Sequence, residues 1–434
     1  MRNKIIIGLV ALLIGIFVGF KLTEALGQQY IMNNLPIPKA TLADKDAFIE
    51  PIKLENKVPT KELSYVNKKA KNIVLLIADG MSWSQLSAYR LLKGGPNARI
   101  SMDKFPVSGI VLTHSEDALV TDSASSATAY STGFKTKNRY LALDSEKNTL
   151  ETLTERISQF GYVSSLIATS EVTHATPAAF ASHVDLRWKT DEISSQMINS
   201  NVTTILGGGR HFFIPKEIGG KREDGKNLLD ELKSSHVLLT NKKELVEFDN
   251  NFLGKVIGLF ADEHLRNIEE PDNHEAEPTL SEMVSFALKR SESFVSNGCK
   301  GFFIMAEGSQ VDWAGHVNNL DYLKSEMEDF DSAVEMVLEY AKINQDTLVI
   351  VTSDHETGGL LIEPVTPSEY TGNELKFSFN TGIGRGSHTG VPVPIYAYGP
   401  GSKNFTGTLD NTDVYRAMIE ALDLSNKENS CVIN

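Results

Sequence analysis

The sequence contains only two cysteines among its 434 residues, Cys299 and Cys431, and they lie far apart in the chain. This scarcity excludes a fold built on a disulfide framework and argues against a metal site with cysteine ligands. We expect Cys299 to be a packing residue. Cys431 begins the outline of a prenylation box, but Asn434 is atypical at the last position, and we predict no lipidation there.

Basic residues are also in deficit: 42 Lys and Arg stand against 56 Asp and Glu, which gives a formal charge of -14. Nucleic acids reward a basic surface, so no nucleic-acid-binding surface is predicted. An anionic substrate would need a local concentration of positive charge. The sequence shows no internal repeat, and its 41% hydrophobic content suffices for one large α/β domain or two smaller ones.

The N-terminus carries one long apolar run. Arg2 and Lys4 precede an apolar stretch over 5–20, a pattern typical of a signal sequence or a membrane anchor. The residues Ala25-Leu26-Gly27 form a fair cleavage site, so cleavage stays open. Residues 1–27 are therefore predicted to be an export signal or a membrane anchor, and the protein to be periplasmic, secreted or held on the extracytoplasmic side of a membrane.

Residues 28–71 are polar and punctuated by proline, which suits a linker, although an N-terminal arm packed on a neighbouring subunit is the alternative. From residue 72 to 425, apolar strand candidates alternate with amphipathic helix candidates. This alternation predicts an α/β fold with a large, doubly wound, mostly parallel sheet and helices on both faces. Residues 426–434 are read as a tail. The predicted strands are 163–168, 203–206, 256–260, 301–306, 348–352 and 395–397.

Two helices are predicted most clearly. The first covers 279–293, where Thr279 and Glu282 form a capping box, and the second covers 320–341, where apolar residues recur at helical spacing. Between 356 and 387 the chain is rich in Gly, Pro, Ser and Asn. That composition predicts a small inserted lobe.

Three strand-like runs each end in a carboxylate that could hold a metal: Asp79, Glu307 and Asp354. Ligands bind at the carboxyl edge of parallel strands in open α/β sheets, so these acids can converge on one pocket. Asp312 and His316 lie four residues apart and share one face if their turn is helical. Zinc accepts this pair of ligand types, although an ordinary surface pair is equally compatible with the spacing.

Further imidazoles and a hydroxyl complete the candidate set. His355 follows Asp354 directly, and His388 lies in a glycine-rich context that lets the backbone approach a ligand. Ser123 lies where a helix of small residues can begin, and a helix N-terminus favours an alkoxide and phosphate oxygens. A tightly packed structural helix is the competing interpretation. Arg187 could hold two phosphate oxygens, or form a surface ion pair.

These segments together resemble those of the alkaline phosphatases, from about Asn72 to Leu424. The segments carrying the resemblance occur in the family's order: Asp79-Gly80-Met81, Thr121-Asp122-Ser123-Ala124, His174-Ala175-Thr176-Pro177, Pro278-Thr279-Leu280, Glu307-Gly308, Asp312 with His316, Asp354-His355-Glu356-Thr357-Gly358-Gly359 and His388-Thr389. The resemblance implies a domain over 72–425 that is catalytic, with a small crown-like lobe at 356–387. It also implies a homodimer.

The resemblance further implies two Zn²⁺ ions and one Mg²⁺ ion. Its ligand sets would be Asp312, His316 and His388 for one zinc, Asp79, Asp354 and His355 for the other, and Asp79, Thr176 and Glu307 for magnesium. Ser123 would become phosphoserine, and Arg187, steadied by Asp122, would clamp the phosphate. His174 and Trp313 stand where the enterobacterial members have Asp and Lys, which bears on the third metal because a neutral imidazole binds magnesium poorly.

The expected activity is hydrolysis of phosphate monoesters, with low leaving-group specificity and release of inorganic phosphate. One alternative is a phosphodiesterase or sulfatase of the same superfamily, although no Cys or Ser occupies the motif that becomes formylglycine in sulfatases. The other alternative is a non-catalytic phosphate-binding or scaffolding protein of the cell surface, tethered to a membrane by its N-terminal apolar segment.

Overall fold

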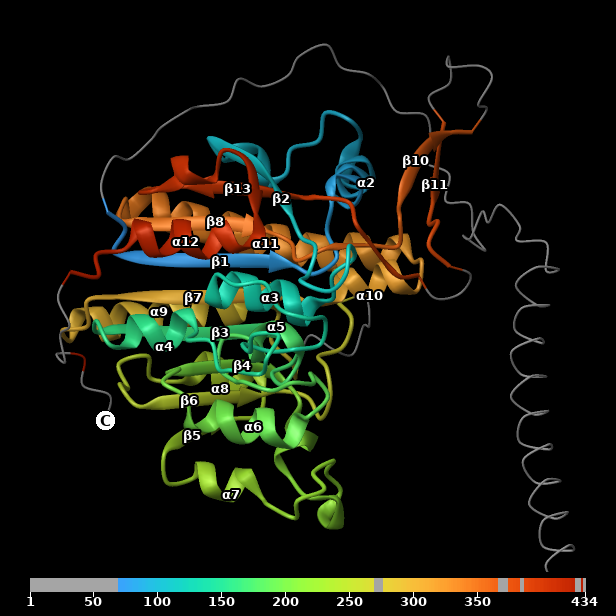
Figure 1. Cartoon of the computed structure of the whole chain (residues 1–434). Helices are drawn as coiled ribbons and strands as arrows, with labels where there is room; N and C mark the ends of the chain where they lie inside the picture. The colour runs from blue at the N-terminus through green and yellow to red at the C-terminus, as the bar shows by residue number, and fades with distance from the viewer. Residues whose placement is uncertain (1–68, 269–275, 366–373, 383–385, 426–430, 432–434) are drawn as a thin grey trace, which may run out of the picture. The chain divides into compact units, whose positions relative to one another are not determined.

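A ten-stranded sheet organises the described part of the chain, which in this computed structural model is residues 69–268, 276–365, 374–382, 386–425 and 431 (Figure 1). The strands lie in the order β14-β2-β13-β8-β1-β7-β3-β4-β6-β5. Neighbouring strands are parallel except where β13 pairs with β2 and β8. The predicted large, mostly parallel sheet is confirmed. The predictions for 1–27 and for nearly all of 28–71 lie outside the described residues.

The strands of this sheet are β1 (Asn72–Ala78), β2 (Val107–Leu112), β3 (Tyr162–Glu171), β4 (Thr204–Gly208), β5 (His236–Leu239), β6 (Lys255–Leu259), β7 (Gly301–Gly308), β8 (Thr347–Thr352), β13 (Val393–Tyr398) and β14 (Gly407–Asp410). The six predicted strands correspond to β3, β4, β6, β7, β8 and β13, with ends that differ by a few residues. β2, β5 and β14 were not predicted. Each lies at or near an edge of the sheet, where a strand is partly exposed and its apolar run is short.

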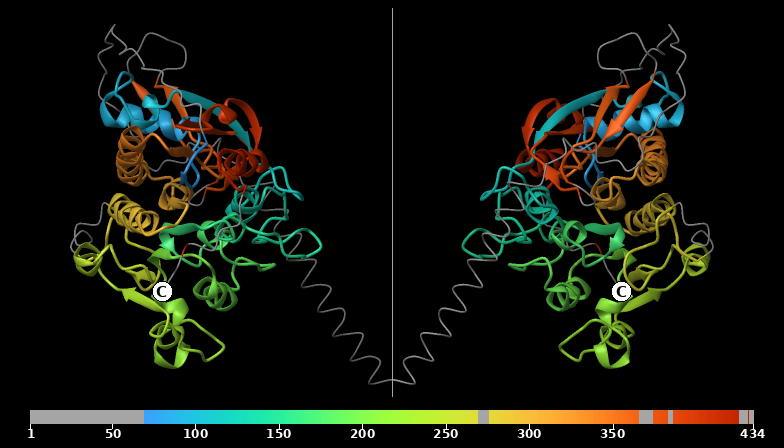
Figure 2. Two further views of the ribbon diagram at one scale, coloured as in Figure 1. Left: turned by 90° about the vertical axis from the view of Figure 1, so that its left-hand side faces the viewer. Right: turned by 90° about the vertical axis from the view of Figure 1, so that its right-hand side faces the viewer.

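Helices cover both faces of the sheet, because its central strands are apolar on both sides. In β1, Ile73, Leu75 and Ile77 join one core cluster, and the alternate residues of the strand join the other. The first cluster contains α3 (Ser123–Thr132), α4 (Leu153–Ser158), α5 (Ala175–Ala178), α6 (Thr190–Asn199), α7 (Leu228–Leu232) and α12 (Asn411–Ala421). The second contains α2 (Trp83–Gly94), α8 (Lys242–Glu247), α9 (Leu280–Ser296), α10 (Gln310–His316) and α11 (Leu320–Asn344). Figure 2 shows α9 and α11 on one side of the sheet and α3 and α12 on the other.

The two clearly predicted helices are present. Thr279 caps α9, its side chain accepting from the backbone N–H of Glu282 while the Glu282 carboxylate accepts from the backbone N–H of Thr279, as the capping box requires. α9 continues to Ser296 and α11 to Asn344, three residues beyond each predicted end. A helix frays at its C-terminus without a strong stop signal, so its last turn is the part that a sequence pattern defines least.

The two cysteines form a disulfide, which corrects the expectation that Cys299 is only a packing residue. Their Cα atoms lie 4.4 Å apart across a sequence separation of 132 residues. The end of the chain returns to the amino edge of the sheet after α12, where the backbone N–H of Ala70 donates to the carbonyl of Ala421. Cys299 lies two residues before β7, at this same edge. The pairing therefore depends on the path of the whole chain, which two isolated cysteines do not report.

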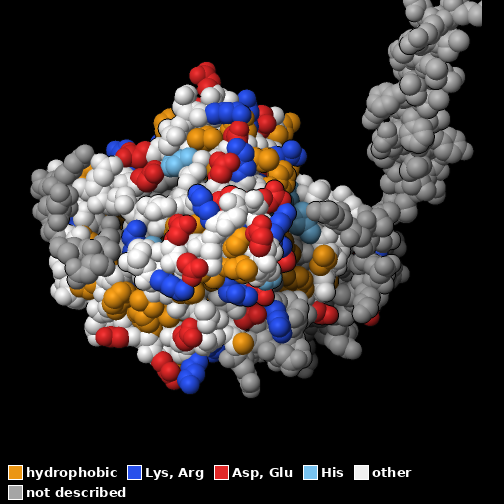
Figure 3. Space-filling view, turned by 90° about the horizontal axis from the view of Figure 1, so that it is seen from below, with side chains coloured by type: hydrophobic (Ala, Val, Ile, Leu, Met, Phe, Trp, Pro, Cys, Tyr) orange, Lys and Arg blue, Asp and Glu red, His pale blue; other side chains and the backbone are white. Residues whose placement is uncertain are grey.

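The predicted inserted lobe at 356–387 contains one short antiparallel pair in its described part, and a second pair joins its first residues to those that follow it. β10 (Leu361–Pro364) pairs with β11 (Leu375–Ser378), and β9 (Glu356–Thr357) pairs with β12 (His388–Thr389). The second pair returns the chain to the sheet edge. Within the described ranges, no helix has the length and apolar character needed to cross a membrane. On the face drawn in Figure 3, acidic and basic side chains are interspersed among apolar ones.

Candidate active site at the carboxyl edge of the sheet

Three neighbouring strands deliver the three predicted carboxylates to one place. β8, β1 and β7 are adjacent in the sheet, and Asp354, Asp79 and Glu307 lie at their carboxyl ends, all with no exposed surface. The turn after β1 is tight: the backbone N–H of Gly80 donates to Asp354 Oδ1 at 3.2 Å. Gly80 has a φ of 79°, and a Cβ there would lie 2.7 Å from the Cα of Asp312. Only glycine fits this turn without displacing the site.

The imidazoles come from loops and a short helix beyond the strands. His355 Nε2 lies 3.5 Å from Asp79 Oδ1 and 3.3 Å from Asp354 Oδ2. Because α10 is helical, Asp312 and His316 share one face, with Oδ2 and Nε2 3.2 Å apart. His388 Nε2 lies 3.6 Å from Asp312 Oδ1, and the rings of His355 and His388 stack with centroids 3.5 Å apart.

Three groups of side chains have ligand atoms within 4.8 Å of one another, close enough to share an ion. They are Asp79, Asp354 and His355; Asp312, His355 and His388; and Asp79, His174 and Glu307. The first matches a predicted zinc set. The second contains His355 in place of His316, which lies beside Asp312 and whose Nδ1 is 2.7 Å from the carbonyl oxygen of Gly386. The third contains two of the predicted magnesium ligands and His174.

Buried polar atoms without a partner gather at these positions. Among the described residues they include both oxygens of Asp79, Oδ2 of Asp354, Oε1 of Glu307, Oγ1 of Thr176 and Nδ1 of His174. A buried polar atom left unpaired costs about 1–3 kcal/mol, and more when it is charged. Divalent cations would satisfy the oxygen atoms of this set together, so the residues present fit the metal ions that the sequence predicts.

The pKa values report the same crowding of like charges. Burial, followed by the charges of Asp354 and Asp312, raises the pKa of Asp79 well above its ordinary value. Burial raises the pKa of Glu307 to about 7. For Asp312, burial acts in the same direction but is outweighed by the hydrogen bond with His316 and the charge of His388, so its pKa is lowered. Without bound cations, the carboxyl groups of this cluster cannot all be ionised at neutral pH.

Ser123 faces the metal-ligand cluster from the first turn of α3. Its Oγ lies 3.2 Å from His355 Nε2. The helix begins here because the side chain of Asp122 caps it, accepting from the backbone N–H of Ser125 at 3.1 Å. The same Asp122 pairs through Oδ2 with Arg187 Nη1 at 3.1 Å. The hydroxyl and the guanidinium are thereby fixed on the same side of the cluster.

His174 lies between the arginine and the third ligand group. Its Nε2 is 2.9 Å from Arg187 Nη2, so the imidazole accepts from the guanidinium. Burial, together with the positive charge of Arg187, lowers the pKa of His174 to about 4. The ring is therefore neutral at physiological pH, and while Nε2 accepts from Arg187 the ring proton lies on Nδ1. Arg187 and Ser123 line a cavity of about 420 Å³ together with His174, Asp312, Trp313, His316, Val317 and His388.

Three supporting residues were not singled out from the sequence. Ser309 Oγ donates to Glu307 Oε2 at 2.6 Å, and Thr357 Oγ1 donates to Asp312 Oδ1. Both hold ligand carboxylates in place, and both lie within two residues of a predicted ligand, which is a usable signal. His264 pairs with Glu171 and packs on Trp313 with ring centroids 4.2 Å apart. No local pattern distinguishes His264.

A doubly wound sheet with candidate metal-ligand groups, a serine at the start of a capped helix and a partly buried arginine at its carboxyl edge is the arrangement expected of metal-dependent phosphate-ester hydrolases. The family model for alkaline phosphatase matches residues 70–371 and 361–424. The chain belongs to the alkaline phosphatase family, and it is a phosphatase that hydrolyses phosphate monoesters. The fold, activity and family predicted from the sequence are thus confirmed.

Individual relatives agree with this assignment. Alkaline phosphatase 3 of Bacillus subtilis is 33% identical, over 83% of this chain and 90% of the relative. The structure of the alkaline phosphatase from the Antarctic bacterium TAB5 is 34% identical, with a TM-score of 0.72 over 83% of this chain and 100% of that one. A variant of the TAB5 enzyme with a histidine replaced by aspartate, described with magnesium bound in its M3 site, has a TM-score of 0.71 at 33% identity and the same coverage.

Proposed function

We propose that this phosphatase transfers the phosphoryl group of its substrate to Ser123 and then hydrolyses the phosphoserine, with two Zn²⁺ ions and one Mg²⁺ ion at the site. The observation that carries this proposal is the position of Ser123 Oγ, 3.2 Å from His355 Nε2 and facing a cluster of buried, unpaired carboxylate oxygens. No general-base triad is needed, because bound divalent cations lower the pKa of a nearby hydroxyl and neutralise charge on the phosphoryl group.

The ligand sets of the proposal are those that the resemblance implies. One zinc would be held by Asp79, Asp354 and His355, the other by Asp312, His316 and His388, and magnesium by Asp79, Thr176 and Glu307 with His174 nearby. The orphaned atoms of Asp79, Thr176 and Glu307 support the third set. The TAB5 variant in which a histidine is replaced by aspartate is described with magnesium bound in its M3 site. That description supports the idea that the residue type, histidine or carboxylate, influences which metal a third site holds.

Arg187 is proposed to bind the non-transferred phosphate oxygens. Its guanidinium is held by Asp122 at 3.1 Å and by His174 at 2.9 Å, which fixes the planar fork before substrate arrives. The phosphoryl transition state spreads charge over its equatorial oxygens, so a positioned arginine stabilises it more than it stabilises the substrate. The N-terminus of α3, where Ser123 lies, also favours a bound anion.

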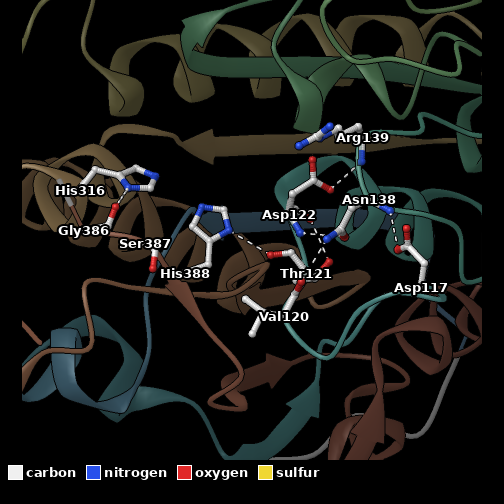
Figure 4. A pocket seen from close by; sticks show the side chains of 10 residues that line it. All are labelled: Asp117, Val120, Thr121, Asp122, Asn138, Arg139, His316, Gly386, Ser387 and His388. Atoms are coloured by element: carbon white, nitrogen blue, oxygen red, sulfur yellow. Dashed lines mark hydrogen bonds between the residues drawn. The ribbon is translucent and has the colours of Figure 1, made fainter. Parts of the chain in front are cut away.

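The mouth of the site is wide, which supports low leaving-group specificity. A cavity of about 910 Å³ lies outside the phosphate position, with Thr121 and Asp122 on one side and His316 and His388 on the other (Figure 4). A cavity of this volume admits leaving groups of many shapes.

Export of the protein is part of the same proposal. The basic and apolar N-terminus supports it, and so does the disulfide between Cys299 and Cys431, which is stable in an oxidising compartment. Whether residues 1–27 are cleaved or remain as a membrane tether follows from the mass of the purified chain. The homodimer rests on the family resemblance, and sedimentation of the purified protein tests it.

The serine route is tested with Ser123→Ala. We expect turnover of nitrophenyl phosphate to fall at least about 10³-fold, while wild-type enzyme quenched in acid carries a phosphoryl group on the peptide that contains Ser123. Ser131→Ala is the matched control, because Ser131 is a buried serine in the last turn of α3 whose Oγ donates to the carbonyl of Thr128. Full activity of Ser123→Ala would contradict the proposal. Faster turnover of nitrophenyl sulfate or of a phosphodiester would contradict the monoesterase assignment.

A further inference from the structure

Arg139 lies at the rim of the active-site cavity and is not needed for any step described above. It lines the 910 Å³ cavity with Asp122, and Figure 4 shows these two residues on the side opposite His316 and His388. Its backbone is bonded to both parts of the phosphate clamp. The backbone N–H of Arg139 donates to Asp122 Oδ1 at 3.1 Å, and its carbonyl accepts from the backbone N–H of Arg187 at 2.9 Å. The position of Arg139 is therefore fixed relative to the phosphate site.

The backbone conformation of Arg139 is unfavourable for a residue with a side chain. Its φ is 76°, in the left-handed region where glycine is normally found. A non-glycine residue in this region costs of order 1 kcal/mol or more. The two backbone hydrogen bonds would form equally well with glycine at this position. The backbone alone therefore does not require arginine at this position.

The guanidinium of Arg139 is charged, held in place and not neutralised. It lies over the ring of Trp188, with Cζ 5.3 Å from the ring centroid, and Trp188 is 61% exposed. No carboxylate among the described residues lies within ion-pair distance of it. The two acids of the cavity are engaged elsewhere, since Asp122 pairs with Arg187 and Asp117 accepts from the backbone N–H of Asn138. A cation–π contact orients a guanidinium and leaves its edge N–H groups available.

We propose that Arg139, supported by Trp188, binds a second anionic group on the leaving group, and so favours phosphate monoesters that carry another phosphate or carboxylate. This inference rests on the phosphate position proposed for Ser123 and Arg187. The second anion accepts from the free edge of the guanidinium while the reacting phosphate occupies the clamp. Arg139 is thus a specificity-determining residue for the leaving-group side of the cavity.

The test compares matched substrates: α,ω-alkanediol monophosphates and the corresponding bisphosphates, with spacers of two to six methylene groups. For wild type, we expect kcat/KM to favour the bisphosphate about tenfold at the best spacer length, and the preference to weaken as salt is added. Arg139→Gly, which suits the positive φ, should lower the preference to the factor of two expected from two reactive ends. Arg139→Lys should retain part of it.

Lys147→Gly is the matched control. Lys147 also has a positive φ, 69°, and also carries an exposed positive charge, but it pairs with Asp185 and does not line the cavity. It should keep the wild-type preference. An equal preference in wild type and Arg139→Gly, or a wild-type preference no greater than two, would overturn the inference.

Binding of non-hydrolysable alkane bisphosphonates and monophosphonates, measured by calorimetry, separates this inference from the proposed mechanism. Arg139→Gly should weaken only the bisphosphonate, by about tenfold. If that loss is found while Ser123→Ala remains fully active, the serine route fails and the Arg139 subsite stands. If Ser123 is required and both ligands bind Arg139→Gly as they bind wild type, only the Arg139 subsite fails.

Discussion

Glutamine at position 307 is expected to stabilise the metal-free protein, in a manner that depends on pH. Glu307 is fully buried, and burial raises its pKa from the ordinary 4.5 to about 7. A carboxyl whose pKa is raised by folding stabilises the fold below its ordinary pKa, and this contribution is lost as the pH rises through the folded value. A pKa difference of one unit between the folded and unfolded states corresponds to about 1.4 kcal/mol, so ionised Glu307 destabilises the metal-free fold by about 3 kcal/mol.

Urea unfolding followed by circular dichroism, with a chelator present, measures this cost. We expect Glu307→Gln to exceed wild type in free energy of unfolding by about 3 kcal/mol at pH 8, with the difference shrinking toward pH 5. The charge of Glu307 also raises the pKa of Asp79, so its removal acts in the same direction there. Glu339→Gln, an exposed site on α11, is the control and should show no such pH-dependent gain.

Added zinc and magnesium should reverse the order of the two proteins, because the glutamine amide replaces a charged oxygen ligand with a neutral one. A difference that does not change with pH, or a Glu307→Gln protein less stable than wild type throughout the chelated series, would refute the reasoning. The first result would mean that Glu307 does not titrate in this range. The second would mean that its packing outweighs its charge.

Three further predictions concern the clamp, the third metal and the disulfide. Arg187→Lys should lower kcat/KM for nitrophenyl phosphate about 10- to 100-fold, because lysine cannot make the bidentate contact with phosphate. An unchanged kcat/KM in steady-state kinetics would mean that Arg187 is not the phosphate clamp. His174→Asp should lower the magnesium concentration needed for half-maximal activity about tenfold, measured on enzyme that has been chelated and then reloaded with metal. The new carboxylate should also pair with Arg187 and raise KM. An unaltered magnesium titration would count against His174 as a neighbour of that site. Cys431→Ser should lower the free energy of unfolding by about 2–4 kcal/mol with little change in turnover, since the bridge with Cys299 closes a loop of 132 residues, and equal melting temperatures would contradict this.

The parts of the site that follow strands could be predicted from the sequence. Asp79, Glu307 and Asp354 each end an apolar run, and parallel strands bring such ends to one edge. The spacing of Asp312 and His316 required only that their turn be helical. These inferences use local patterns and one general rule of sheet topology.

Other parts depend on contacts that no local pattern encodes. His388 reaches the cluster because β12 pairs with β9, two-residue strands separated by the inserted lobe. The sequence indicated His388 only as an imidazole in a glycine-rich context, and its assignment to a metal came from the family resemblance. The disulfide of Cys299 required knowledge of where the chain returns after α12. Arg139 could not be identified from the sequence. Its proposed role depends on a positive φ and on the contact with Trp188, and neither follows from the order of residues.

The spread of the ligand cluster along the chain has a consequence for biosynthesis. Its members extend from Asp79 to His388, and the strands that bear them, β8, β1 and β7, are neighbours in space but not in order of synthesis. A nascent chain that has not yet reached residue 388 lacks a complete set, however well its earlier part folds. If these residues hold the catalytic ions as proposed, catalytic activity reports that nearly the whole domain has been synthesised and folded.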